Sequence, residues 1–264
     1  PDNRKWEEMI EKIRKIDKNN KVKIAIVGKY IKLEDSYISV IESIKHAGFA
    51  NDVETEIKLI DAEKITKDTA DEVLKEFQGI IVPGGFGNRG IEGKIETIKY
   101  ARENKIPFLG ICLGMQMAVV EYARDVLGLQ DANSQEFDEK SKNQVIHIME
   151  NQKSVNKKGG TMRLGSYPCV IKEGTLAEKV YGTTEIAERH RHRFEYNNDY
   201  KERLENAGLI CSGTSPDGEL VEIVELSQKE HPFFIAGQFH PELKSRPNRP
   251  APLFVELVRV AKSR

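Results

Sequence analysis

Cys112 carries the clearest chemical signal in the chain, because it stands in the run Phe108-Leu-Gly-Ile-Cys-Leu-Gly-Met-Gln116. An apolar strand pattern leads into Gly-x-Cys-x-Gly, and an amphipathic helix pattern follows, which is the thiol version of a nucleophile elbow. The glycines are needed because a Cβ would crowd so tight a turn. The amino-terminus of the helix favours the thiolate, and the N–H of Leu113 points to where an oxyanion would form. The pattern therefore predicts a nucleophilic cysteine rather than a buried structural one.

A nucleophilic cysteine needs a base, and His240 is the best placed of the six histidines. It follows the apolar run 233–239 at the end of a predicted central strand and precedes Pro241-Glu242. Residues i and i+2 of an extended chain point the same way, so Glu242 can accept a hydrogen bond from one ring nitrogen while the other faces Cys112. This spacing predicts a relay of nucleophile, base and orienting carboxylate.

The other histidines and glycines give no pattern for a metal ion or a nucleotide phosphate. Ordinary helix or loop contexts surround His46, His147 and His231. His190 and His192 lie in Arg189-His-Arg-His-Arg193, where five consecutive potential cations would repel a metal ion. No Gly-x4-Gly-Lys-Ser/Thr occurs, so we expect no metal, no cofactor and no ATP bound by this chain alone.

A glycine-rich turn supplies the third part of the predicted site. The run Pro83-Gly-Gly-Phe-Gly87 follows an apolar strand pattern, so it lies at the sheet edge where such folds bind ligands. Glycines there allow a close backbone approach to a substrate. Gly85 can therefore donate a second hydrogen bond to the oxyanion, although an ordinary tight turn has the same composition.

The elements that position these segments follow an alternating α/β pattern. Strand patterns at 22–28, 53–60, 79–82 and 107–112 alternate with helix patterns at 70–77, 91–104 and 115–127. This rhythm predicts a mostly parallel sheet with helices on both faces. Later segments predict a polar surface excursion at 131–158, a small antiparallel extension at 161–224, a strand at 233–239 and a helix at 252–261. Residues 1–20 are expected to form a linker with an amphipathic helix, and 21–264 a single domain.

Composition limits the classes of partner. The 264 residues carry 41 Lys and Arg against 42 Asp and Glu, which argues against a nucleic acid or a membrane as the main partner. Three cysteines form no disulfide framework, and the first residues have no export signal, so we expect a reducing, cytoplasmic setting. Pro1 in place of Met suggests a fragment of a longer polypeptide.

The motifs resemble those of the triad-type, class I glutamine amidotransferases, and within them the glutaminase domains of the CTP synthase family. The likeness covers 21–264. It rests on Pro83-Gly-Gly-Phe-Gly-Asn-Arg-Gly90, Gly110-Ile-Cys-Leu-Gly-Met-Gln116, Asn133-Ser-Gln-Glu-Phe137, Thr161-Met-Arg-Leu-Gly165, Glu188-Arg-His-Arg-His-Arg-Phe-Glu195 and Gln238-Phe-His-Pro-Glu242. The resemblance implies a flavodoxin-like sandwich and hydrolysis of L-glutamine through a thioester on Cys112, with His240 moving the proton and Glu242 holding the imidazole.

The same resemblance implies how glutamine is bound. Glu136 and Arg193 would meet the α-amino and α-carboxylate groups of the substrate, which suits their charges. An oxyanion hole and cradle would come from the backbone of Gly85, Leu113, Gly114, Met115 and Gln116.

Partners are also implied by the resemblance. An N-terminal synthetase domain, absent from this chain, would use ATP and Mg²⁺ to aminate UTP to CTP with the released ammonia. The longer enzyme would be a homotetramer that GTP activates, and Arg89 and Arg163 are candidates for that coupling.

Three other readings stay open from the sequence. The chain could be a stand-alone cysteine hydrolase of the same fold, such as a peptidase or a γ-glutamyl hydrolase. It could be the glutaminase of another biosynthetic amidotransferase, or a non-catalytic domain that senses glutamine.

Overall fold

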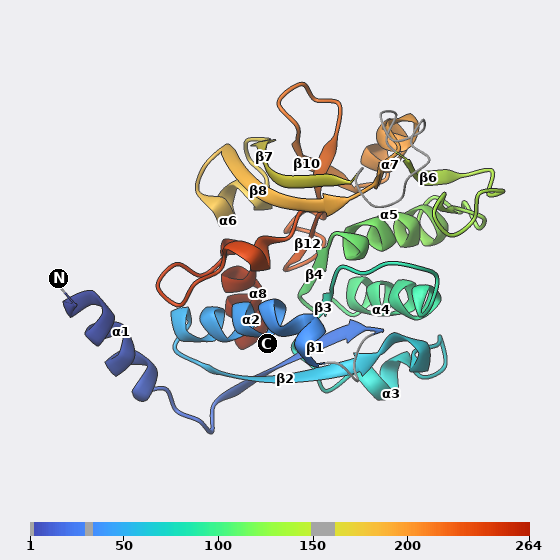
Figure 1. The fold of residues 1–264 in the computed structure, drawn as a ribbon. Coiled ribbons are helices and arrows are strands. Elements are labelled where there is room, and N and C mark those ends of the chain that lie inside the picture. Colours follow the sequence, from blue (N-terminus) through green and yellow to red (C-terminus); the bar gives the residue numbers. More distant parts are fainter. Residues whose placement is uncertain (1–2, 30–33, 149–161) are drawn as a thin grey trace.

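The computed structural model describes residues 3–29, 34–148 and 162–264 (Figure 1). Three features named from the sequence lie outside these residues: Pro1, the end of the excursion at 149–158, and Thr161 of the Thr-Met-Arg-Leu-Gly run. The main feature is a nine-stranded sheet with the strand order β2-β1-β3-β4-β12-β11-β10-β7-β8. A separate three-stranded sheet has the order β5-β6-β9.

The parallel half of the large sheet confirms the predicted strands. It consists of β2 (Glu54–Asp61), β1 (Lys21–Gly28), β3 (Gly79–Val82), β4 (Phe108–Ile111) and β12 (Phe234–Gly237). Every residue of β3, β4 and β12 is buried, as expected of central strands that are covered on both faces. Their carboxyl ends lie side by side, so the glycine-rich turn, Cys112 and His240 emerge at one edge of the sheet.

The antiparallel half continues the same sheet. It consists of β11 (Val221–Glu225), β10 (Ile210–Thr214), β7 (Arg163–Ile171) and β8 (Glu185–His192). The predicted antiparallel extension is therefore present, attached to β12 through β11. Two short helices, α6 (Leu176–Tyr181) and α7 (Lys201–Asn206), interrupt a segment for which only strands were expected.

Helices cover both faces of the sheet and create two apolar cores. On one face lie α3 (Ala70–Leu74), α4 (Ile91–Glu103) and α5 (Leu113–Asp125), and on the other α2 (Ile38–Ala50) and α8 (Pro252–Lys262). Strand β1 shows the division, because Ala25 and Val27 pack into the first core while Ile24 and Ile26 pack into the second. Short 3-10 helices span Glu34–Tyr37 (η1), Ala62–Lys64 (η2), Asn198–Tyr200 (η4) and Pro241–Lys244 (η5).

The region after residue 128 is more ordered than its sequence indicates. We expected a polar surface segment without regular structure there. This expectation was wrong for two stretches that form strands, β5 (Asn133–Ser134) and β6 (Gln144–Ile148). Strand β6 pairs with β9 (Phe194–Tyr196), and its Val145 and Ile146 are fully buried. Since β9 comes from a segment far along the chain, no local pattern could reveal this pairing.

The amino-terminal helix α1 (Arg4–Arg14) lies within the segment 1–20 where an amphipathic helix was predicted, and it is at the margin of the molecule (Figure 1). Its Trp6 is 49% exposed. Lys12 forms an ion pair with Asp52 at 3.1 Å, just beyond the end of α2. Among the residues that the structure describes, no helix combines the length and the apolar character needed to cross a bilayer.

A buried ion pair fastens α4 to α5, the helix that follows Cys112. The Arg102 guanidinium donates to both carboxylate oxygens of Glu121, with Nε–O distances of 3.0 and 3.1 Å and an Nη2–Oε1 distance of 2.7 Å. The Glu121 side chain is completely buried. Burial raises the pKa of Glu121, and Arg102 opposes that rise.

We predict that Arg102→Met destabilises the fold by about 3–5 kcal/mol, because it leaves the Glu121 carboxylate buried without its partner. The double variant Arg102→Met/Glu121→Leu should regain most of that loss, since it removes both charges. Urea denaturation of the two variants and the wild type measures this difference. Equal losses in the single and double variants would contradict it.

Candidate active site

Cys112 occupies the junction between β4 and α5 in a strained backbone conformation. Its φ is 52° and its ψ is −103°, a region that costs a residue with a side chain about 1–3 kcal/mol. The N–H of Cys112 donates to the Gly237 carbonyl at 2.7 Å. A Cβ on Gly114 would lie 2.0 Å from the Val82 carbonyl oxygen, so only glycine lets α5 approach β3 this closely. Neighbouring strands thus hold the turn on both sides.

His240 follows β12 and is held in place by Glu242. The His240 Nδ1–Glu242 Oε1 distance is 2.7 Å, and Glu242 lies in η5. The backbone N–H of His240 donates to the Arg189 carbonyl of β8 at 2.8 Å. A Cβ on Gly84 would lie 2.8 Å from His240 Cε1 and 3.6 Å from the Cys112 Cβ. The absence of a side chain at Gly84 therefore lets the imidazole and the cysteine lie together beside the glycine-rich turn.

Electrostatics favour a protonated His240. Burial alone would lower the pKa of this imidazole, but the Cys112 sulfur and the Glu242 carboxylate outweigh it and raise the pKa to about 10. The Cys112 sulfur has two further polar neighbours, the Arg191 carbonyl at 3.8 Å and the Gln238 amide nitrogen at 3.7 Å. The arrangement suits an ion pair of thiolate and imidazolium.

A cavity of about 330 Å³ opens beside Cys112. Its lining consists of Gly85, Phe86, Cys112, Leu113, Gln116, Glu136, Met162, Arg191, His192, Arg193 and Phe194. The residues expected to cradle glutamine line it, except two. Met115 is buried in the apolar core and Gly114 packs against β3, so neither faces the cavity.

Charges of both signs face this cavity. Glu136 accepts a hydrogen bond from the Gly87 N–H at 3.3 Å. Burial raises the pKa of Glu136, while that hydrogen bond and the nearby cations Lys29, Arg193 and Lys94 lower it. Arg193 lines the same cavity. An anion and a cation in one small cavity can bind the two charged groups of a free amino acid.

A second cavity, of about 410 Å³, reaches Cys112 from another side. His240 and Glu242 line it together with Tyr37 and Pro83, and none of these four residues lines the first cavity. Cys112 faces both spaces. The nucleophile can therefore be approached by two different molecules.

Phe86 and Gln238 lie at the site but were not predicted from the sequence as site residues. Phe86 is 44% exposed, and its ring lies 5.7 Å from the Arg191 guanidinium. Gln116 donates to the Phe194 carbonyl at 3.0 Å and to Gln238 at 3.2 Å, so it fixes the amide next to the sulfur. The signal for Gln238 was available, since it begins the Gln-Phe-His-Pro-Glu run, two residues before His240.

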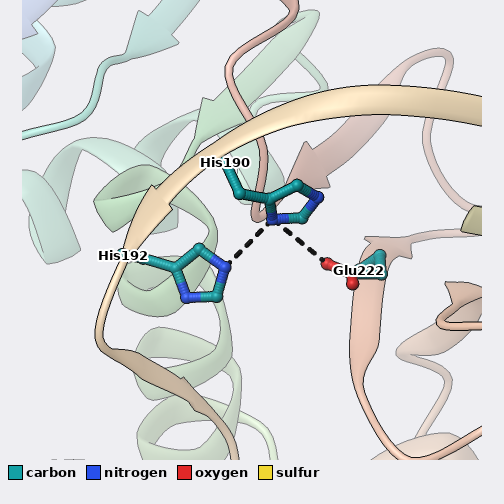
Figure 2. A group of neighbouring side chains, drawn as sticks. All are labelled: His190, His192 and Glu222. Atoms are coloured by element: carbon teal, nitrogen blue, oxygen red, sulfur yellow. Dashed lines mark hydrogen bonds and ion pairs between the residues drawn. The ribbon is translucent and has the colours of Figure 1, made fainter. Parts of the chain in front are cut away.

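Figure 2 shows a buried cluster of His190, His192 and Glu222, whose side chains face one another. His190 Nδ1 lies 3.0 Å from His192 Nε2 and 3.7 Å from the nearer Glu222 oxygen. Such groups can hold a metal ion, but Arg163 already donates to Glu222 and its Nη1 lies 3.5 Å from His190 Nδ1. Burial, reinforced by Arg163, lowers the pKa of both histidines far below the usual value. The residues fit a hydrogen-bonded network of neutral imidazoles better than a metal site, because a cation already occupies it.

The two arginines expected to couple to GTP differ in their surroundings. Arg163 has a side chain only 10% exposed, paired with Glu222 and stacked 4.4 Å from the Tyr167 ring. Arg89 is 55% exposed and donates to the Lys29 carbonyl at 3.0 Å. Arg89 is therefore the more accessible of the two, and both stay candidates for the coupling.

Comparison with known proteins agrees with this geometry. A family model described as glutamine amidotransferase class-I matches residues 32–260. CTP synthase of Clostridium acetobutylicum is 56% identical over 260 residues, which cover 98% of this chain and 48% of that protein. CTP synthase of Geobacillus kaustophilus is 55% identical over 256 residues, with 97% and 48% covered. The chain thus spans about half the length of the curated relatives it matches.

One solved structure is similar over nearly its whole length. It is the glutaminase domain of Trypanosoma brucei CTPS with bound acivicin, with a TM-score of 0.85, 41% identity, and 92% of this chain and 94% of that one covered. The chain therefore belongs to the glutamine amidotransferase class-I family, which confirms the predicted family and fold. Within the family it groups with the glutaminase domains of CTP synthases.

We predict that Cys112→Ala lowers the pKa of His240 by roughly one to three units, because it removes the anion that raises it and leaves burial in place. An NMR titration of the imidazole Cε1–H signals measures this pKa. The wild-type pKa of about 10 lies above the usual 6.5, so the imidazolium contributes stability that is complete below pH 6.5 and is lost as pH rises through about 10. Cys211→Ala is the control and should leave His240 unchanged. An unaltered midpoint in Cys112→Ala would contradict the pairing.

Proposed function

We propose that the chain hydrolyses L-glutamine to glutamate and ammonia through a thioester on Cys112. One observation carries the proposal. Cys112 lines one cavity together with the hydrogen-bonded pair of His240 and Glu242, and it also lines the cavity that contains Glu136 and Arg193. Membership of an amidotransferase family supports the choice of substrate.

The first half of the reaction forms the thioester. The Cys112 thiolate attacks the side-chain carbonyl carbon of glutamine, and the electron pair of the C=O bond moves to oxygen. The amides of Gly85 and Leu113 would stabilise that oxyanion. The amide of Leu113 is suited to this, since the first N–H groups of a helix have no partner within it. The C–N bond then breaks, and His240 gives its Nε2 proton to the departing amine, which leaves as ammonia.

The second half regenerates the enzyme. His240, now neutral, takes a proton from a water molecule that attacks the thioester, and the C–S bond breaks to give glutamate and the thiolate. Glu242 keeps Nδ1 protonated, so Nε2 is the nitrogen that exchanges protons in both halves. The second cavity adjoins His240 and gives water a route that does not cross the substrate cavity.

Substrate choice rests on opposite charges. Glu136 would accept from the α-ammonium group and Arg193 would donate to the α-carboxylate, so a free amino acid fits while an internal peptide residue lacks both charges. This distinction disfavours a peptidase.

We further propose that, in a longer protein, the ammonia serves the ATP- and Mg²⁺-dependent amination of UTP to CTP by a synthetase domain. The support is that the matched relatives are named CTP synthase and are about twice as long as this chain. Activation by GTP, with Arg89 and Arg163 as candidates for the coupling, and assembly of the longer enzyme as a homotetramer belong to the same proposal.

A glutamine-like electrophile such as acivicin should label Cys112 alone. Burial raises the pKa of Cys169 to about 12 and that of Cys211 to about 11, so both stay unreactive thiols at neutral pH. Mass spectrometry of tryptic peptides locates the adduct. Cys112→Ala should take up no label and release no ammonia from glutamine, while its melting temperature stays within a few degrees. An adduct on either buried cysteine would overturn the assignment.

Arg193→Lys should raise KM for glutamine roughly 10- to 100-fold with little change in kcat. Lysine cannot reproduce the two-pronged grip of a guanidinium on a carboxylate, and a charge-assisted hydrogen bond contributes about 1.5–3 kcal/mol. Steady-state kinetics of ammonia release measures both constants. Arg203→Lys, beside Tyr200 and outside both cavities, is the matched control. An unchanged KM would assign the carboxylate to another residue.

A further inference from the structure

Lys94 carries a buried charge that the proposed reaction does not use. It lies in the first turn of α4, directly after the glycine-rich turn, and is 1% exposed. Its side chain is one of the largest fully buried side chains among the described residues. Burying an ammonium group costs several kcal/mol unless nearby negative charges offset the loss of water. An apolar side chain of similar size would pack there without that penalty.

Lys94 lies next to Gly85, a residue of the predicted oxyanion hole. A Cβ on Gly85 would lie 3.7 Å from Lys94 Nζ and 3.5 Å from Leu113 Cδ2. Gly85 lines both cavities, and Lys94 lines neither. The ammonium group therefore lies next to a residue that lines the cavities without lining them itself.

The charges that act on Lys94 come from the active site. Burial and the cation of Lys29 lower its pKa to about 8, while Glu136 and the Cys112 sulfur favour the ammonium form. Each electrostatic interaction acts equally on both partners. The positive charge of Lys94 must therefore favour the anionic forms of Cys112 and Glu136.

We propose that Lys94 is a positioning residue for glutamine hydrolysis: it supplies a buried positive charge next to Gly85, the predicted oxyanion donor. The inference rests on the proposed function. As the thiolate attacks, negative charge moves from sulfur to an oxygen bound by the Gly85 amide, next to Lys94. An interaction that strengthens as this charge develops lowers the barrier more than it aids substrate binding.

Lys94→Met tests the proposal, because methionine nearly fills the same volume without the charge. We expect kcat for ammonia release to fall roughly 10- to 100-fold, less than or equal to the loss of one direct oxyanion donor, with KM changed by less than about threefold. The melting temperature should stay the same or rise, since a buried charge is removed. Lys99→Met on the same helix removes a lysine whose side chain is 27% exposed and should leave kcat unchanged.

The pH profile separates this role from simple support of the fold. The groups that face Lys94 are Lys29 just after β1, Cys112 just before α5, and Glu136 from the segment after β5. As pH rises through about 8, wild-type Lys94 loses its charge, so kcat should fall toward the value of Lys94→Met. The variant should lack this step and decline only near pH 10, where His240 loses its proton. Parallel profiles, or an unchanged kcat in the variant, would overturn the proposal.

A measurement without glutamine distinguishes the failure of this inference from the failure of the proposed function. Iodoacetamide reacts with the thiolate, so Lys94→Met should slow alkylation of Cys112 roughly three- to tenfold at pH 7. If the wild type releases no ammonia from glutamine, the proposed function fails, and the alkylation rates still decide whether the charge of Lys94 acts on Cys112. Equal alkylation rates in the two proteins would remove Lys94 from the site.

Discussion

Cys112 has to end strand β4 and begin helix α5 within a single residue, and this turn requires a left-handed backbone angle in a residue that has a side chain. The structure holds the angle through neighbouring strands: the Gly237 carbonyl of β12 accepts from Cys112, and Val82 of β3 lies against Gly114. The same two strands end in the turn that carries Gly84 and Gly85 and in the loop that carries His240. The strain at one residue is therefore offset by the contacts that bring the base and the oxyanion hole to it.

The environment decides the protonation of chemically identical side chains. His192 is buried and His240 is mostly buried, both near Cys112, yet the pKa of His192 falls to about 3 and that of His240 rises to about 10. Burial lowers both values. His240 faces the anions Glu242 and Cys112, whereas His192 faces the cation Arg163, which reinforces burial. One imidazole can exchange protons in catalysis, and the other serves as a neutral hydrogen-bonding group in the cavity wall.

Features encoded within one short segment were predictable from the sequence, and features shared between distant segments were not. The elbow at Cys112 and the central strands have local signatures, because glycine placement and continuous apolar runs follow from backbone geometry and burial. The pairing of β6 with β9 has none, since neither strand can be recognised without the other. The surroundings of Arg163 had no local signature for the same reason: its partner Glu222 lies on a different strand. The roles of the site residues in catalysis remain predictions.

In the proposed reaction, the glycine-rich turn would connect the group that binds the substrate's charge with the oxyanion hole, because both involve residues of the same turn. Gly85 lies beside Lys94, and Gly87, two residues on, donates its N–H to Glu136. In the proposed binding mode, the α-ammonium group of the substrate would compete with that N–H for the Glu136 carboxylate. A ligand without an α-ammonium group would leave the Gly87 hydrogen bond as it is. The turn would thus respond to an amino acid differently from other amides, because Gly85 and Gly87 belong to the same few peptide units.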